Sequence, residues 1–494
     1  MPLPKVIGSE IEYGITVQND RDFDPISNCV LLVNSYEDNQ EARILWDYDQ
    51  ENPLADARGF DVEGEKYTPN QQENIARNKT LKNGARFYVD HAHPEYSTPE
   101  VTNVLDLLAY ERAGERSLEQ ARRAASLLLP FNNVLLVYKN NSDRKGNSYG
   151  NHENYLLERR TPFKDIVEHM TPFLVTRQIF CGSGKVGSEN RASPCDYQIS
   201  QRADFFETEV ALDTMVKRPI INTRDEPHAE REKYRRLHII VGDSNLCEVS
   251  TYLRMGVTSI VLGLIEDGEI TKNLSIVDPV RIIKEVSHDP SCKREYQMER
   301  GGHMTAVQIQ QEFLAMSLRY FSSHEIDPII KDVLVRWESV LGRLAEDPML
   351  LAREVDWVIK RKLIMDYMSK RGLDWKHPQV QMLDLQYHDI RPDKGLYFLL
   401  ERRGTVDRII EDEMIEKAII DPPTDTRAYF RGECIRRYSD SVFGVNWDSI
   451  SFNLGEEPIK RILMNEPLKG TKAHVEELLD ASPTVQELVR NLTS

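Results

Sequence analysis

The sequence predicts an α+β protein in which helices cover one side of an antiparallel or mixed sheet. Two observations lead to this fold class. Short segments with alternating side chains, typical of strands, occur in the first half of the chain, and long segments with apolar residues at helical spacing lie between and after them. The 494 residues, 40% of them hydrophobic, suffice for a large core. We expect a large domain over residues 1–420 and a small mixed domain over 421–494, which opens with the turn sequence DPPTDT.

The first expected strand covers residues 5–16, with Glu10 and Glu12 on one face and Ile11 on the other. A helix should follow over 28–40. The stretch 43–83 has no sustained period, so we interpret it as a functional or mobile insertion. The other expected elements are strands over 85–90, 134–139, 153–159, 196–206 and 238–245, and helices over 103–129, 163–180, from the last strand to about 266, and 305–373.

Composition narrows the classes of function. The net charge of −17, spread along the chain, argues against a nucleic-acid binder. Six scattered cysteines without metal-ligand spacing indicate reduced thiols in the cytoplasm. No signal peptide precedes the first strand, and the longest apolar runs are too short to span a bilayer. We therefore expect a cytoplasmic protein that binds no membrane.

The strand at 85–90 carries Arg86, Tyr88 and Asp90 on one face, and Glu95 follows it in the segment DHAHPEY. If this strand pairs with the first one, Glu10 joins these side chains. Clustered carboxylates repel one another unless a cation neutralises them, and ligation by oxygen suits Mg²⁺. The sequence thus predicts a magnesium site here. We interpret the two turn histidines, at 91 and 93, as hydrogen-bonded residues and not as metal ligands.

Basic residues suggest a place for phosphate. His152 lies in the glycine-rich turn GNSYGNHENY, which could approach a phosphate or be an ordinary hairpin. The tract CGSGKVG (181–187) is no P-loop, because Ile179 and Val186 stand where glycine and Ser or Thr are required. Arginines gather in RPIINTRDEPHAEREKYRRLHIIVGDSN (218–245). Beside a magnesium site, a phosphate clamp is favoured over surface ion pairs.

Together the segments GSEIEYG, RFYVDHAHPEYSTPE, NSYGNHENYLL, SQRADF, RPIINTRDEPHA and EKYRRLHIIVGDSN resemble the family that attaches and removes the bacterial ubiquitin-like protein Pup. This resemblance implies a glutamine synthetase-like domain, with a curved, mostly antiparallel sheet backed by helices. One branch of the family ligates Pup to lysines; the other hydrolyses that bond and deamidates Pup. The insertion RILWDYDQENPLADARGFD (43–61) and the spacing in DHAHPEY, one residue shorter than in the ligases, resemble the hydrolytic branch.

The resemblance also implies roles for single residues. Asp90 matches the catalytic aspartate, as nucleophile or general base, and Glu10, Tyr88 and Glu95 match magnesium-site positions. Residues expected around the nucleotide, its phosphates, bound metal or the substrate carboxyl are Arg86, Thr98, His152, Arg202, Arg224, His238, Arg427, Arg431 and Trp447.

The implied cofactors are Mg²⁺ and ATP or ADP, with the nucleotide not consumed. The implied partners are Pup and pupylated proteins, with a functional link to the bacterial proteasome. The insertion at 43–83 would be a flexible gate. The alternatives are a Pup–protein ligase, a small-molecule carboxylate–amine ligase, and a nucleotide-regulated protein that only captures Pup.

Overall fold

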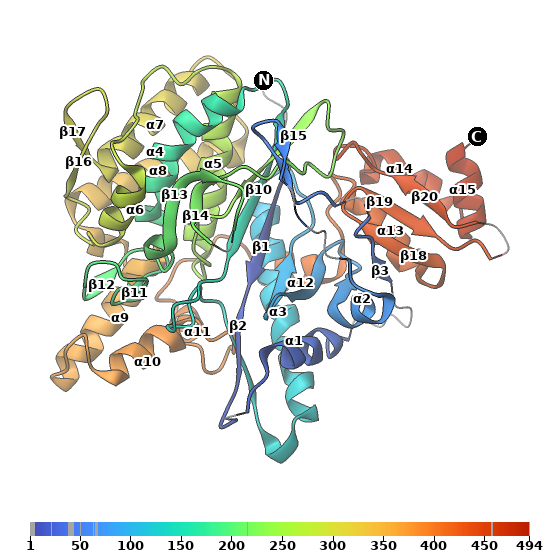
Figure 1. The fold of residues 1–494 in the computed structure, drawn as a ribbon, viewed down its shortest axis with the longest axis horizontal. Helices are drawn as coiled ribbons and strands as arrows, with labels where there is room; N and C mark the ends of the chain where they lie inside the picture. Colours follow the sequence, from blue (N-terminus) through green and yellow to red (C-terminus); the bar gives the residue numbers. More distant parts are fainter. Residues whose placement is uncertain are drawn as a thin grey trace.

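The computed structural model describes residues 5–20, 22–37, 44–49, 51–62, 64, 68–214, 216–455 and 458–493. Its centre is a six-stranded antiparallel sheet in the order β15-β10-β1-β8-β7-β6 (Figure 1). These strands are β1 (Ile7–Glu12), β6 (Asn78–Thr80), β7 (Arg86–Asp90), β8 (His93–Ser97), β10 (Asn151–Glu158) and β15 (Tyr234–Ile239). The large antiparallel sheet with helices confirms the predicted fold class.

One expectation about strand order is wrong. The first strand does not pair with the strand at 86–90, because β8 lies between β1 and β7. The segment His93–Ser97 folds back on β7 through a tight turn and supplies this intervening strand. Its proline and histidines hid the strand pattern in the sequence, since proline is uncommon within sheets.

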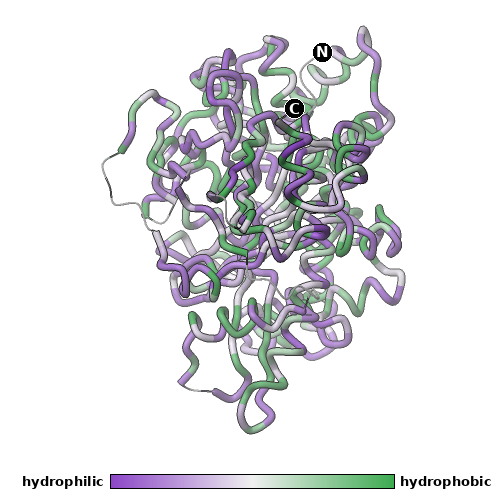
Figure 2. The backbone as a smooth tube through the Cα atoms, turned by 90° about the vertical axis from the view of Figure 1, so that its right-hand side faces the viewer, coloured by the Kyte–Doolittle hydropathy of each residue, from purple (hydrophilic) through white to green (hydrophobic). Residues whose placement is uncertain are grey.

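The two faces of the sheet differ in character. Ile11, Tyr96 and Phe87 face each other across β1, β8 and β7 and are fully buried against helices α1 (Pro25–Asn34) and α3 (Val104–Leu128). Hydropathy changes over short distances along the backbone, as expected for elements with one apolar and one polar face (Figure 2). The other face of the sheet carries the polar residues of the candidate site.

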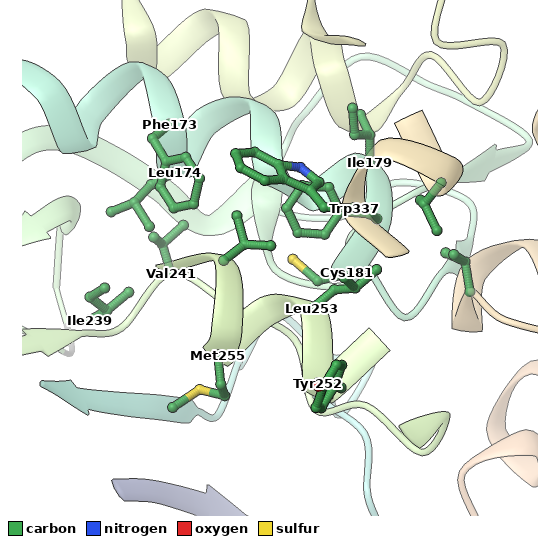
Figure 3. Packing of buried hydrophobic residues seen from close by; sticks show 14 of the residues in the cluster. Phe173, Leu174, Ile179, Cys181, Ile239, Val241, Tyr252, Leu253, Met255 and Trp337 are labelled. Atoms are coloured by element: carbon green, nitrogen blue, oxygen red, sulfur yellow. The ribbon is translucent and has the colours of Figure 1, made fainter. Parts of the chain in front are cut away.

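The largest core cluster lies where the sheet meets helices α4 (Phe163–Cys181), α5 (Glu248–Glu266) and α8 (Pro328–Glu346). Figure 3 shows Phe173, Ile179 and Trp337 gathered above Cys181 and Leu253. Of the described residues, only α5 is long and apolar enough to cross a membrane by length and composition, and 94% of that stretch is buried inside the protein. It is the central helix of this core.

The remaining elements follow the predicted order with a few differences. All six cysteines are unpaired, as expected. The other helices are α2 (Gln71–Arg77), α6 (Pro279–Ser287), α7 (Ala306–Phe321), α9 (Asp356–Arg371), α10 (Pro378–Tyr387), α11 (Leu396–Arg402), α12 (Asp412–Ile420), α13 (Ala428–Arg437), α14 (Lys472–Asp480) and α15 (Val485–Thr493). The other strands are β2 (Gly14–Val17), β3 (Leu45–Trp46), β4 (Ala55–Asp56), β5 (Phe60–Asp61), β9 (Leu135–Tyr138), β11 (Lys185–Val186), β12 (Tyr197–Gln198), β13 (Phe206–Ala211), β14 (Arg218–Asn222), β16 (Glu295–Gln297), β17 (His303–Thr305), β18 (Val442–Asn446), β19 (Ser449–Phe452) and β20 (Lys460–Leu463).

Two element predictions need correction. The helix expected over 28–40 is α1, which begins three residues earlier because Asp24 caps it and Pro25 occupies its first position; residues 38–40 lie outside the described part of the chain. The strand expected over 196–206 is wrong. There, only Tyr197–Gln198 is paired as a strand before a 3₁₀ turn leads into β13.

The insertion contains more structure than its sequence indicates. Among its described residues, α2 and β6 form regular elements, and β6 is the edge strand of the central sheet. Residues 43, 50, 63 and 65–67 lie outside the described residues. The gating role of the insertion stays a prediction.

A third core cluster comprises residues from α13 to α15 and the strands between them, joined by Ile44 and Trp46 from the insertion. Strand β3 adds to β18 in parallel, so the C-terminal sheet contains a strand from far earlier in the chain. Elements α13 to α15 and β18 to β20 form the group drawn in orange and red at the right of Figure 1, and β3, drawn in blue, lies beside them. The boundary at residue 420 between two domains stays a prediction.

Candidate active site

Strand register aligns the polar residues of the open sheet face in rows. Tyr88, Glu95 and Glu12 are direct cross-strand neighbours on β7, β8 and β1. In the next row Glu10 of β1 lies opposite His152 of β10. Because cross-strand neighbours project from the same face, these side chains converge although they lie far apart in the sequence.

The first row contains a cluster of three carboxylates: Glu12, Asp90 and Glu95. Each could offer one ligand atom, and these atoms lie within 4.8 Å of one another. Burial, reinforced by the neighbouring Asp90, Glu12 and Glu10, raises the pKa of Glu95 well above its usual value. Burial likewise raises the pKa of Tyr88 far above its usual value, so its hydroxyl stays protonated. The unfavourable proximity of like charges is what a bound divalent cation would relieve.

A second group consists of Glu10, His152 and His238, whose ligand atoms meet the same 4.8 Å limit. Glu10 lies 3.3 Å from His152 Nδ1 and accepts a 2.9 Å hydrogen bond from Asn154. Burial opposes its charge, but His152, His238 and Arg236 more than offset that cost and hold the pKa of Glu10 well below its usual value. Burial lowers the pKa of His238, which leaves a neutral imidazole able to bind a metal.

Asp90 ends β7 at the rim of the acidic cluster, and its side chain is 37% exposed. The next residue, His91, has φ +50°, in the left-handed region that residues with a side chain seldom adopt. This conformation brings His91 Nδ1 to 2.8 Å from Asp90 Oδ2. Partial burial alone would raise the pKa of Asp90, but the hydrogen bond from His91 and the charges of His152 and Arg86 lower it. Asp90 is therefore an ionised carboxylate that is accessible from outside.

The second turn histidine, His93, stacks on Tyr149 at 4.3 Å between ring centroids, and its Nδ1 lies 3.2 Å from the carbonyl oxygen of Tyr13. Neither it nor His91 belongs to a metal-ligand group among the described residues. His91 lies in the turn, whereas His93 is the first residue of β8, and both are hydrogen-bonded.

A pocket with an empty volume of about 560 Å³ opens beside the Glu10 group. Apolar residues of β1 and β10, such as Ile7 and Leu156, line it together with Trp447. Thr98 also lines it and accepts a 3.0 Å hydrogen bond from the Ser9 N–H, so it fixes the pocket wall. A flat, partly apolar pocket that ends at an acidic and basic cluster suits a nucleotide, with the base among the apolar residues and the phosphates at the charged end.

Arg86 is buried and enclosed by aromatic rings. Its guanidinium lies 3.9 Å from the ring centroid of Trp46 and 3.8 Å from that of Tyr88. It also donates hydrogen bonds to Asn78 Oδ1, at 3.1 Å from Nε, and to the Tyr48 hydroxyl, at 3.0 Å from Nη2. Arg86 thus connects the insertion to the Tyr88 end of the acidic cluster.

Arg427 and Arg431 of the C-terminal segment share one carboxylate, that of Glu100. Arg427 Nε donates to it at 2.8 Å, and Arg431 contacts it through both terminal nitrogens. Arg431 also donates to the carbonyl oxygens of Gly84 and Trp447, at 3.1 and 2.9 Å. Of the two arginines, only Arg427 lines the pocket. Through these hydrogen bonds Arg431 links the turn at Trp447 to the loop that precedes β7.

The remaining arginines divide between the two faces of the sheet. Arg202 and Arg218 both donate to Ser148, to its hydroxyl at 3.2 Å and its carbonyl oxygen at 2.7 Å. Burial, together with the charge of Arg218, lowers the pKa of Arg202 to about 10. Arg236 lies beside Glu10, whereas Arg235 points to the opposite face and donates to the carbonyl oxygen of Thr161. Arg235 is therefore not part of the cluster expected over 218–245.

Two residues that the structure places in the site had no role predicted from the sequence, Glu12 and Glu100. Glu12 completes the acidic cluster, and its position two residues after Glu10 on one strand was an available signal. Arg236 was expected within the arginine cluster over 218–245, and it stands two residues before His238 on the same face. Glu100 follows β8 in an irregular segment, and no local pattern marks it.

Comparisons with known proteins identify the family and the fold. The family model described as Pup-ligase protein matches residues 5–451. A depupylase from Acidothermus cellulolyticus is 48% identical and covers 99% of each chain, and a Pup deamidase/depupylase from Mycolicibacterium smegmatis is 44% identical over the full length of both. A solved complex between Pup and its ligase PafA aligns with a TM-score of 0.82 and 30% identity, over 97% of this chain and 91% of the other. PafA in complex with ADP aligns with a TM-score of 0.75 and 32% identity, over 85% and 96%.

Proposed function

Because the chain belongs to the Pup-ligase family, we propose that it is a depupylase and Pup deamidase. It hydrolyses the isopeptide bond between the C-terminal Glu side chain of Pup and a substrate lysine, and it converts a C-terminal Gln of Pup to Glu. The observation that carries this proposal is the match over the full length, insertion included, to relatives named for these hydrolytic activities. A ligase of the same fold would instead catalyse the formation of that isopeptide bond.

The nucleotide is ATP or ADP, and the pocket beside Glu10 is its site. Trp447 and the apolar residues of β1 and β10 would enclose the base, and Thr98 and Arg427 form the adjoining wall. Arg224, Arg236 and the neighbouring histidines lie toward the phosphate end. An ADP complex of a protein with the same fold supports the binding of a nucleotide. Because hydrolysis of an amide is favourable, the nucleotide is a bound cofactor that is not consumed.

Magnesium fits the carboxylates of the site. Glu12 and Glu95 of the first group would hold it, with Glu10 of the second group nearby, because carboxylates supply the oxygen ligands that Mg²⁺ prefers. The second group, with two imidazoles, also suits a transition metal. Tyr88 is a neutral phenol in this structure, which makes it a hydrogen-bond donor to the cluster more readily than an anionic ligand. A bound cation would supply positive charge that stabilises the oxyanion formed from the scissile carbonyl.

Asp90 carries out the chemistry from the rim of this cluster. As a nucleophile, its carboxylate oxygen attacks the amide carbon, the C–N bond breaks, and the amine leaves with a proton; water then hydrolyses the resulting anhydride. As a general base, Asp90 takes a proton from the attacking water instead. Both routes require the ionised carboxylate, which His91 orients and stabilises.

The substrate carboxylate has a basic site available. Arg202 and Arg218 form no ion pair with a carboxylate among the described residues, and both are anchored at Ser148. Guanidinium groups bind carboxylates through paired hydrogen bonds. They would hold the free carboxylate of Pup's last residue, so that its side-chain amide faces Asp90. Pup and pupylated proteins are the partners, in the cytoplasm and with a link to the bacterial proteasome.

The test uses Asp90→Asn with three readouts. Incubation with Mg²⁺, ATP and a Pup–lysine conjugate should give no free target by mass spectrometry, and Pup ending in Gln should stay unchanged. ADP should bind as tightly as to the unmodified chain, because Asp90 lies outside the pocket lining. Full activity in this variant, with reversion to Asp excluded by mass spectrometry, contradicts the assignment. Stoichiometric ADP formation with new conjugates would instead identify a ligase.

A further inference from the structure

The described part of the insertion between residues 44 and 62 is attached at two places, to the turn at Trp447 and to the loop at 223–226. At its start, β3 pairs with β18, and the ring of Trp46 lies 5.2 Å from that of Trp447. Trp46 Nε1 then donates a 2.7 Å hydrogen bond to Glu51. The next residue, Asn52, donates its N–H to Glu226, which stands in the loop between β14 and β15. The segment therefore connects the nucleotide pocket to that loop.

The second attachment is a short piece of antiparallel pairing centred on Asp56 and Arg224. The Ala57 N–H donates to the carbonyl oxygen of Thr223 at 2.7 Å, and the Asp225 N–H donates to that of Ala55 at 2.9 Å. The Thr223 hydroxyl adds a 2.6 Å hydrogen bond to Asp56 Oδ2. These contacts fix the backbone on both sides of Arg224.

The carboxylate of Asp56 is buried, at 2% exposure, and its hydrogen bonds are satisfied. Besides Thr223, it accepts from the Arg58 N–H and Nε at 2.9 Å each and from Arg58 Nη2 at 2.7 Å. A carboxylate that accepts four hydrogen bonds is held in one orientation. A displacement of the insertion at Asp56 would therefore displace the loop at Thr223. Removing it would leave Thr223 without its hydrogen-bond acceptor in a buried place.

Arg224 is the residue that this arrangement presents to the site. It stands two residues before Glu226, whose carboxylate lies 3.5 Å from Arg236 of the pocket lining, so Arg224 lies near the charged end of the pocket. Its Nε is buried without a hydrogen-bond partner, and it forms no ion pair with a carboxylate among the described residues. Arg224 as a whole is partly buried, so its guanidinium group has no carboxylate partner but can be reached by an anion, and a phosphate would satisfy its N–H donors.

We propose that Asp56 is a positioning residue that sets Arg224 against the phosphates of the bound nucleotide. This inference rests on the proposed nucleotide site. The insertion thereby contributes to nucleotide affinity through Thr223 and the loop backbone, without touching the nucleotide at Asp56 itself.

The experiment is a double-mutant cycle on the full-length protein, read out as ADP affinity by calorimetry. Asp56→Asn should weaken ADP binding about five- to tenfold, while kcat for conjugate cleavage at saturating ATP changes little. Thr223→Val should weaken it similarly, and Thr223→Ser, which keeps the hydroxyl, should restore wild-type affinity. The matched control Asp61→Asn changes an exposed aspartate of the same segment and should have no effect.

In an Arg224→Gln background, Asp56→Asn should cause no further loss of affinity. An equal additional loss there would show that Asp56 acts generally on stability and overturns the proposal, as would unchanged affinity in Asp56→Asn and Thr223→Val. If Asp56→Asn does not fold, Thr223→Val completes the same cycle. Unchanged ADP affinity in Arg224→Gln also refutes the inference, whereas the proposed function is judged separately by whether the unmodified chain cleaves the conjugate.

Discussion

Replacing Glu100 by glutamine removes the carboxylate that Arg427 and Arg431 share between the sheet and the C-terminal segment. Burial opposes the charge of Glu100, but the two arginines more than offset this and lower its pKa to about 2 from an ordinary value of 4.5. The side chain is 14% exposed, so solvent screens the pair only weakly. A difference of this size corresponds to roughly 3 kcal/mol of folding free energy at neutral pH. This value agrees with the loss of about 3–5 kcal/mol in folding free energy that is typical when one partner of a buried ion pair is removed.

The sign of the pH dependence follows from the lowered pKa. The contribution of Glu100 is complete above the ordinary glutamate pKa of 4.5 and is lost as the pH falls towards about 2. The stability difference between the unmodified chain and Glu100→Gln should therefore be constant from pH 6 to 8 and shrink below about pH 4.5.

Urea denaturation followed by tryptophan fluorescence measures this difference, and ADP binding reports on the Trp447 side of the pocket, which Arg431 holds. We expect a loss of about 3 kcal/mol and weaker ADP binding. Glu416→Gln is the matched control, because that glutamate is 70% exposed and its ion pair with Arg116 should contribute less than about 1 kcal/mol. Equal stability and equal ADP affinity in Glu100→Gln and the unmodified chain would refute the reasoning.

Three further outcomes are expected. His91→Asn removes a group that lowers the pKa of Asp90, so the acid limb of the pH profile of kcat/KM should move to higher pH; an unmoved limb contradicts this role. Glu12→Gln should raise the Mg²⁺ concentration needed for half-maximal activity by about tenfold or more, measured by titration after chelation, and an unchanged requirement removes Glu12 from the metal site. Gly114→Ala would place a Cβ 2.5 Å from the ring of Tyr96, which should cost about 1–3 kcal/mol despite better helix propensity; a more stable variant in urea denaturation would show that the ring can move aside.

The sequence predicted the long helices and the central strands because their apolar periods are regular. Helix α3 shows this well, since Asn103 caps it at the expected place. The strand at 93–97 was missed because its residues are needed for chemistry and for the turn, and they replace the usual alternation. The short strands of the insertion could not be predicted for a different reason: they are stabilised by partners at 224 and 444, which a local pattern cannot reveal.

Site residues that lie on strands with clear faces share one face of the sheet, as the alternation predicted, and their roles stay predictions. Glu10, Tyr88 and Glu95 lie on this face with Asp90 at its rim, although through an unexpected strand order. Arg431 was predicted to contact the nucleotide, but in the structure it donates hydrogen bonds to the carboxylate of Glu100 and to two backbone carbonyl oxygens. Its ligand is decided by Glu100, more than 300 residues away in the sequence. Such long-range pairing is decided by the tertiary structure alone.

The position of β1 in the middle of the sheet bears on how the protein is made. Its neighbours β8 and β10 begin at residues 93 and 151, so in a growing chain at least one edge of the first strand stays unpaired until both have been synthesised. Closing such long loops delays sheet formation. Because Glu10 and Glu12 lie on this strand, their repulsive cluster cannot assemble before the sheet does. Folding and the acquisition of metal affinity should therefore be a single late event, and fragments ending before β10 should show neither.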